Sequence, residues 1–232
     1  CKKISYGIKS FADLRGADLN IRSDGMKLNV LGVMDLTLHI TGLFNVYNVL
    51  AAVGASLAEN IRPDIITRAL ENFKSVPGRF ERLEHDLPFE VIVDYAHTPD
   101  GVAKVLETAA QIVKGKIITV VGCGGDRDHS KRPIMGKTAA NLSDLLIITS
   151  DNPRTEDPEK ILDEVETGVG DKIHERIVDR QTAIFRAIEL AKPSDIVLIL
   201  GKGHETYQIL NTGKIHFDDR EIAREAIKKW KN

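Results

Sequence analysis

Short apolar runs alternate with stretches of helical periodicity from about residue 80 to the end of the chain. The runs rich in Ile, Val and Leu predict buried strands over Phe89–Val93, Ile117–Val121, Leu145–Thr149, Arg176–Val178 and Ile196–Leu200. The segments between and after them predict helices over Pro99–Val113, Pro133–Leu142, Pro158–Thr167, Gln181–Ala191 and Asp219–Trp230, with a hairpin about Asn211-Thr212-Gly213. Strands that each return through a helix are typical of a parallel sheet covered on both faces. We therefore expect an open, doubly wound, mostly parallel α/β sheet.

The start of the chain follows a different pattern. Alternating runs and a turn predict a small antiparallel β patch, built from Lys3–Ile8, Leu28–Val33 and Leu36–Ile40 with the turn at Ser23-Asp24-Gly25. Two helices are expected next, over Phe44–Ala58 and over Asp64–Phe73 behind Pro63. Val76-Pro77-Gly78 then interrupts the pattern, so we predict two domains, 1–77 and 78–232.

The composition is that of an ordinary water-soluble protein. The 232 residues are 42% hydrophobic and 28% charged, with a net charge of −2. This balance argues against nucleic acid or an anionic membrane as a partner held by bulk charge, and no apolar run approaches the ~20 residues of a membrane-spanning helix. Two cysteines do not make a disulfide framework, which favours the cytoplasm. Cys1 in place of Met is typical of a piece of a longer chain, the alternative being a lipidated terminus.

Polar and glycine-rich clusters follow four of the predicted strands. They are Asp94–His97, Gly122–Asp128, Asp151–Arg154 and Gly201–Glu205. Because Rossmann-like sheets bind ligands outside the carboxyl ends of their strands, we expect the four clusters to meet along one edge and form a site. The alternative for each cluster alone is ordinary turn and helix-cap chemistry.

The residue types in these clusters suit a small zwitterion. Arg127 and Arg154 can each hold a carboxylate through the guanidinium fork, and Glu205 can accept an ammonium group. The alternative is that they form surface ion pairs without function. Gly122–Gly125 resembles a phosphate-binding turn but lacks the third glycine of a dinucleotide fingerprint. The sequence also has no nucleotide-binding loop of the Gly-x-x-x-x-Gly-Lys-Ser/Thr type, no zinc-ligand spacing and no Gly-x-Ser-x-Gly elbow.

Seven motifs in order resemble the Mur ligase family, within the branch that adds meso-diaminopimelate to UDP-N-acetylmuramoyl-L-alanyl-D-glutamate. The motifs are Gly42–Asn48, Val76–Glu81, Asp94–Pro99, Gly124–Asp128, Lys131–Pro133, Asp151–Arg154 and Gly201–Glu205. The resemblance implies a cytoplasmic, monomeric, ATP- and Mg²⁺-dependent amide ligase of peptidoglycan synthesis, and hence a part in cell-wall growth, cell shape and division. In such ligases a carboxylate becomes an acyl phosphate that the incoming amine attacks, so no catalytic nucleophile is expected from the protein.

The same resemblance implies site residues position by position. Those matching the nucleotide-binding residues of the family are Asn45, Asn48, Arg79 and Asp94. Those matching its meso-diaminopimelate pocket are Arg127, Asp151, Asn152, Pro153, Arg154, Gly201 and Glu205. Arg154 is the discriminating position, because the far carboxylate of diaminopimelate needs a cation that lysine as a substrate would not.

The chain departs from the family in what it lacks. The N-terminal uridine-nucleotide domain, the glycine-rich ATP loop, the Mg²⁺-binding glutamate and the carbamylated lysine are not among the 232 residues. Residues 1–77 resemble the end of the central ATP-binding domain, and 78–232 the C-terminal amino-acid-binding domain. We therefore expect the isolated chain to be inactive. The alternatives are a non-catalytic module that binds a diamino acid or a nucleotide, and a folylpolyglutamate- or cyanophycin-type ligase, against which Asp151–Arg154 argues.

Overall fold

The computed structural model describes residues 3–9, 11–22 and 24–230. It divides into two compact units, Cys1–Ser75 and Val76–Asn232. Cys1, on which the alternative of a lipidated terminus rests, lies outside the described residues. Within the described ranges, every helix is too short or too polar to cross a lipid bilayer.

The first unit is a four-stranded sheet with two helices. Its elements are β1 (Tyr6–Gly7), β2 (Leu14–Arg22), β3 (Gly25–Val30), β4 (Met34–Leu38), α1 (Leu43–Ala58) and α2 (Pro63–Glu71), with the strands in the order β1-β2-β3-β4. The helix faces that carry Val46, Leu50 and Val53 on α1 and Ile66 on α2 join the core formed by the sheet. Burial of such side chains, at roughly 1.5–3 kcal/mol each, holds the layers together.

One expectation for this unit was wrong, and one strand was missed. The patch is not wholly antiparallel, because β1 pairs parallel with β2. The long strand β2 was not predicted, since a register shift between Ala17 and Asn20 interrupts its pairing and its pattern of alternation. The predicted turn before β3 is present at Asp24, and Gly25, with φ 151°, begins the strand, while Ser23 lies outside the described residues.

The second unit contains the expected doubly wound sheet. Its strands are β5 (Glu81–Arg82), β6 (Glu90–Asp94), β7 (Ile117–Cys123), β8 (Leu145–Ser150), β9 (His174–Arg176), β10 (Ile196–Leu200) and the hairpin β11 (Tyr207–Leu210) and β12 (Gly213–His216). Its helices are α3 (Pro99–Ile112), α4 (Lys131–Leu142), α5 (Pro158–Glu166), α6 (Arg180–Leu190) and α7 (Asp219–Lys229). The six-stranded sheet has the order β5-β6-β10-β7-β8-β9, and its pairs are parallel except for β5 with β6.

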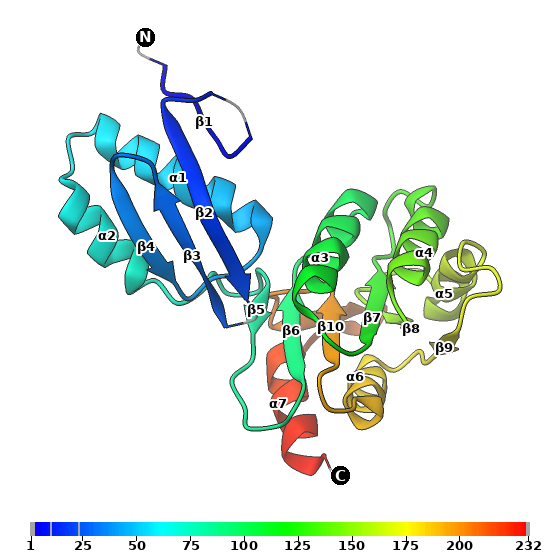
Figure 1. The fold of residues 1–232 in the computed structure, drawn as a ribbon. Coiled ribbons are helices and arrows are strands. Elements are labelled where there is room, and N and C mark those ends of the chain that lie inside the picture. The colour runs from blue at the N-terminus through cyan, green and yellow to red at the C-terminus, as the bar shows by residue number, and fades with distance from the viewer. Residues whose placement is uncertain (1–2, 10, 23, 231–232) are drawn as a thin grey trace. The chain divides into compact units, whose positions relative to one another are not determined.

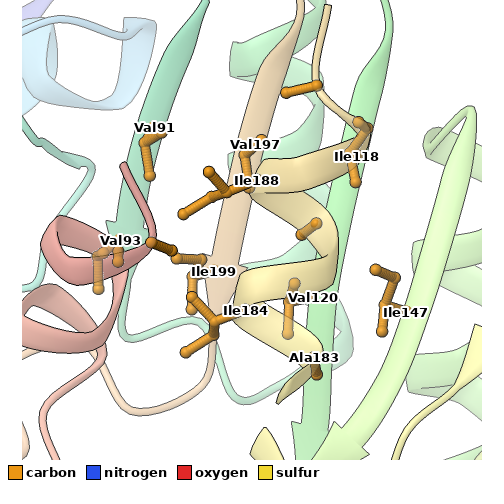
Figure 2. Close-up of a cluster of buried hydrophobic side chains, with 14 of the residues drawn as sticks. Val91, Val93, Ile118, Val120, Ile147, Ala183, Ile184, Ile188, Val197 and Ile199 are labelled. Atoms are coloured by element: carbon orange, nitrogen blue, oxygen red, sulfur yellow. The ribbon is translucent and has the colours of Figure 1, made fainter. Parts of the chain in front are cut away.

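Helices cover both faces of this sheet. Figure 1 shows α3, α4 and α5 on one face and α6 and α7 on the other. The core beneath α6 is built from alternate strand residues such as Val91, Val93 and Val197, which pack with Ile184 and Ile188 of the helix (Figure 2). The intervening Ile92 is also fully buried, because successive strand side chains point to opposite faces. Burial on both faces explains the continuous apolar runs in the sequence.

The direction in which the chain adds strands to the sheet reverses once. The chain runs outward through β6, β7, β8 and β9 by way of α3, α4 and α5, and α6 then returns β10 to a place between β6 and β7. The carboxyl ends of four parallel strands thus lie side by side in the order β6-β10-β7-β8, at the kind of topological switch point where such sheets bind ligands.

Candidate amino-acid-binding site

A pocket of about 340 Å³ lies at the carboxyl ends of β6, β10, β7 and β8. Its lining residues are Tyr95, His97, Gly122, Cys123, Gly124, Arg127, Asp128, Lys131, Arg132, Met135, Asp151, Asn152, Arg154, Gly201 and Glu205. The expectation that the four strand-end clusters meet along one edge is thereby confirmed. Six of the seven residues matched to the amino-acid pocket line it. The seventh, Pro153, lies instead beside a second hollow with Thr155 and Asn211.

The glycines after β7 allow two loops to approach closely. The Gly125 amide donates to the Asn152 carbonyl over 2.9 Å, and a Cβ on Gly125 would lie 1.9 Å from the carbonyl oxygen of Pro153. Any side chain at this position would push the loop after β8 away. The glycine turn that resembles a phosphate cradle thus serves in this structure to bring the Asp151–Arg154 loop against β7.

Arg154 is held by main-chain carbonyls. Its backbone is left-handed, with φ 54°, and its backbone amide donates to the carbonyl of Ile209 in β11 over 3.0 Å. One guanidinium nitrogen, Nη1, donates to the Gly125 carbonyl over 2.7 Å. Arg127, by contrast, is exposed, and its Nη1 donates to the Asp126 carbonyl over 2.9 Å. The pocket therefore presents one anchored and one exposed guanidinium.

Two carboxylates, those of Asp151 and Glu205, line the same pocket. Burial raises the pKa of Asp151, although Arg180 and Lys202 oppose this effect. A Cβ on Gly201, where φ is 117°, would lie 2.6 Å from the Asp151 carboxylate, so glycine is needed there. Glu205 accepts hydrogen bonds from Asn152 and Lys202, and these outweigh its own burial and lower its pKa.

A buried ion pair supports the floor of the pocket and was not predicted. Arg180, at the start of α6, and Asp219, at the start of α7, are both fully buried and pair over 2.7 Å. Arg180 also donates to the carbonyls of Ser150 and Leu200, the last residues of β8 and β10. In the sequence each residue stands among charged residues at a helix start, which is typical of a solvated helix end, so the pattern carried no signal for this pair.

The residues matched to a nucleotide belong to different units. Asn45 and Asn48 lie on one face of α1 in the first unit, where the Asn48 amide donates to the Asn45 side chain over 3.0 Å. Arg79 and Asp94 belong to the second unit. Asp94 is buried and accepts the amides of Phe80 and Ala96, both at 2.7 Å, so its carboxylate shapes the turn that follows Arg79.

Arg79 itself is exposed, and its guanidinium carbon lies 4.9 Å from the centre of the Tyr95 ring. No carboxylate pairs with this guanidinium in the part of the chain that the structure describes. An exposed, unpaired cation stacked on an aromatic ring is suited to an anionic ligand.

Comparisons with known proteins identify the family of this chain. Residues 78–203 match the model of the Mur ligase, glutamate ligase domain, and residues 1–56 match the Mur ligase middle domain. The chain is 47% identical over 232 residues to a UDP-N-acetylmuramoyl-L-alanyl-D-glutamate–2,6-diaminopimelate ligase from Clostridium botulinum, covering 98% of this chain and 48% of the relative. It is 50% identical over 230 residues to a ligase of the same name from Gloeobacter violaceus, covering 97% and 47%.

The fold of this chain is also found in solved structures of Mur ligases. A structure of a UDP-N-acetylmuramoyl-L-alanyl-D-glutamate–2,6-diaminopimelate ligase superposes with a TM-score of 0.73 at 36% identity, covering 97% of this chain and 47% of that chain. The fold is also shared, at 20% identity and a TM-score of 0.67, with the UDP-N-acetylmuramate-alanine ligase of Thermotoga maritima, with coverage of 97% and 47%.

The chain spans about half the length of the curated relatives it matches. The glutamate ligase domain model alone covers more than half of the chain, and the fold superposes on that of a solved ligase over 97% of the chain. This chain belongs to the Mur ligase family.

Proposed function

We propose that this chain supplies the amino-acid-binding half of an ATP-dependent ligase that adds meso-diaminopimelate to UDP-N-acetylmuramoyl-L-alanyl-D-glutamate. In this proposal, residues 1–77 are the end of the central domain and 78–232 the amino-acid-binding domain. The protein works as a cytoplasmic monomer in peptidoglycan synthesis, and hence in cell shape and division. The observation that carries the proposal is the convergence of Arg127, Arg154, Asp151 and Glu205 on one pocket.

The charges of the pocket complement those of the amino acid. Diaminopimelate carries a carboxylate and an ammonium group at each end, so a matching site needs cations and anions within one small volume. Arg154, with Nη1 fixed on the Gly125 carbonyl, is preorganised to hold the distal carboxylate. Glu205 and Asp151 can accept the distal ammonium, and Arg127 can reach the carboxylate at the reacting end.

The reaction needs little covalent chemistry from the protein. The nucleotide-linked peptide is phosphorylated on its carboxylate by ATP, the free amine of the bound amino acid attacks the acyl phosphate, and the tetrahedral intermediate expels phosphate. The pocket contributes by holding the two ends of diaminopimelate so that its reacting amine has one position. Proximity of this kind is worth several kcal/mol of the barrier, roughly 7–11 in the best intramolecular cases.

The residues of this chain fit a nucleotide better than a metal ion. Arg79 places its guanidinium over an aromatic ring, and Asn45 and Asn48 present amide groups on one helix face. We assign these three residues and the Asp94 turn to the nucleotide. Among the described residues no three His, Cys, Asp or Glu side chains are grouped so that they could hold a metal ion. We therefore assign no residue of this chain to Mg²⁺.

The test is an assay of the full-length protein that contains this chain. With ATP, Mg²⁺ and the UDP-linked dipeptide, we expect the UDP-linked tripeptide by mass spectrometry, with kcat/KM for meso-diaminopimelate about tenfold or more above that for L-lysine. Preference for lysine would contradict the assignment of Arg154. Binding of diaminopimelate without ADP formation would favour the non-catalytic binding module instead.

A further inference from the structure

We propose that Lys202 is a positioning residue: it holds Asn152 and Glu205 so that one carboxylate oxygen of Glu205 receives the distal ammonium group of the substrate. This inference deepens the proposed function and rests on it. Lys202 belongs to the Gly201–Glu205 motif but was not predicted as a site residue.

The burial of Lys202 is unusual for a lysine. Its side chain is 0% exposed, and its ammonium group lies 3.1 Å from Glu205 Oε2 and 3.2 Å from Asn152 Oδ1. The ammonium also lies 5.5 Å from the centre of the Tyr207 ring. A buried cation persists only when it is paired and hydrogen-bonded, so these contacts define what Lys202 does in the fold.

Lys202 fixes which way the Asn152 amide faces. Asn152 Oδ1 accepts two donors, the Lys202 ammonium and the backbone amide of Ile209 at 2.9 Å. A rotated side chain would bring its NH₂ group against both donors. The NH₂ group therefore points the other way and donates to Glu205 Oε2 over 2.9 Å.

The same arrangement leaves one oxygen of Glu205 for a ligand. Oε2 accepts from both Asn152 and Lys202, whereas Oε1 accepts no hydrogen bond from the described residues. The Glu205 side chain is 18% exposed and lines the pocket. Two donors on one oxygen hold the carboxylate in its charged form and in one rotamer, and they turn the other oxygen into the acceptor for an ammonium group.

The held Glu205 carboxylate should make the enzyme specific for an amino acid with a distal ammonium group. 2-Aminopimelate keeps the reacting amine and both carboxylates of diaminopimelate and lacks only the distal ammonium. An enzyme whose Glu205 is correctly held should prefer meso-diaminopimelate strongly over 2-aminopimelate, and that preference should depend on Lys202.

The experiment measures kcat and KM for both amino acids in the full-length ligase. For Lys202→Met we expect kcat/KM for meso-diaminopimelate to fall about tenfold or more, mainly through KM, as for the loss of a charge-assisted contact. We expect kcat/KM for 2-aminopimelate and the KM for ATP to stay within about threefold of wild type. Lys104→Met, which removes an exposed lysine of α3, is the matched control. It should leave kcat/KM for both amino acids unchanged.

The outcomes separate the two proposals. A wild-type enzyme that does not ligate meso-diaminopimelate overturns the proposed function itself and this inference with it. A wild-type ligase that does not prefer meso-diaminopimelate over 2-aminopimelate overturns only the inference. Equal losses on both amino acids in Lys202→Met also overturn it, because they assign Lys202 a merely structural role.

A second pair of variants covers the case in which Lys202→Met does not fold. The double variant Lys202→Met/Glu205→Gln leaves no unpaired buried charge behind. Since Lys202 acts through Glu205, the double variant should show the same ratio of kcat/KM for the two amino acids as Glu205→Gln alone. A further loss of about tenfold in that ratio would contradict the inference.

Discussion

Asp151 and Glu205 lie on the same pocket, yet their pKa values move in opposite directions. Burial raises the pKa of Asp151, which accepts no side-chain hydrogen bond from the described residues. Burial acts on Glu205 as well, but the donors Asn152 and Lys202 outweigh it and lower the pKa. Pairs of titratable groups separated in this way often divide a task between them.

Arg154→Ala tests the carboxylate anchor in the full-length enzyme. We expect the KM for meso-diaminopimelate to rise about tenfold or more, equivalent to about 1.4 kcal/mol or more, because a charge-assisted contact is lost. Steady-state kinetics with varied amino acid and saturating ATP measure this. Arg186→Ala removes a half-buried arginine on α6 that pairs with Glu175 and does not line the pocket, and it serves as the control. A KM unchanged by Arg154→Ala removes that residue from the site.

At the scale of secondary-structure elements, Arg180 and Asp219 connect four parts of the second unit. The pair joins the starts of α6 and α7, and Arg180 bonds the carbonyls that end β8 and β10. The loops that carry Asp151 and Gly201 begin at these strand ends. The buried pair therefore fixes the strand ends from which the pocket loops start.

Removing one partner of this pair should lower the free energy of unfolding far more than removing both. We expect Arg180→Met to lower the free energy of unfolding by about 3–5 kcal/mol, since it leaves Asp219 buried and uncompensated, whereas Arg180→Met/Asp219→Leu should recover much of that loss. Urea unfolding followed by the fluorescence of Trp230, the single tryptophan, reports on the second unit. A double variant less stable than the single one would refute this account of the pair.

At the scale of the whole molecule, the chain consists of two units with separate cores. The strand-end pocket lies entirely within the second unit, whereas the residues assigned to a nucleotide are divided between the two. The proposed binding of an amino acid and the proposed binding of a nucleotide therefore involve different residues, and each can be measured separately.

The polypeptide of residues 1–232 should not hydrolyse ATP. The reason is that its sequence contains no glycine-rich loop able to wrap the β- and γ-phosphates. A phosphate-release assay with ATP and Mg²⁺, with and without meso-diaminopimelate, measures this, and the full-length protein assayed in parallel is the positive control. Steady phosphate release that persists through repeated purification would show the expectation to be wrong.

The helices and strands of the second unit were largely predictable, because continuous apolar runs and helical spacing persist through Ile196–Leu200 and Pro99–Ile112. The short strands at the edge of the sheet were not predictable. β5 consists of two charged residues, Glu81 and Arg82, so it shows no apolar run or alternation that would indicate a strand. The meeting of the four clusters followed from the parallel topology, but the insertion of β10 between β6 and β7 did not, since no local pattern encodes the order of strands.

The sequence by itself determined the alternation of strands and helices, the family motifs and the polar residues at the strand ends, because these depend on periodicity and on neighbours along the chain. Only the tertiary structure decided which of those residues share a pocket, that Pro153 lies outside its lining, and that Lys202 and Arg180 are buried beneath it. The physical reason is that burial and pairing of a charge depend on groups dozens of residues away. A lysine or arginine next to a turn has the same local pattern whether it is solvated or holds a carboxylate in place.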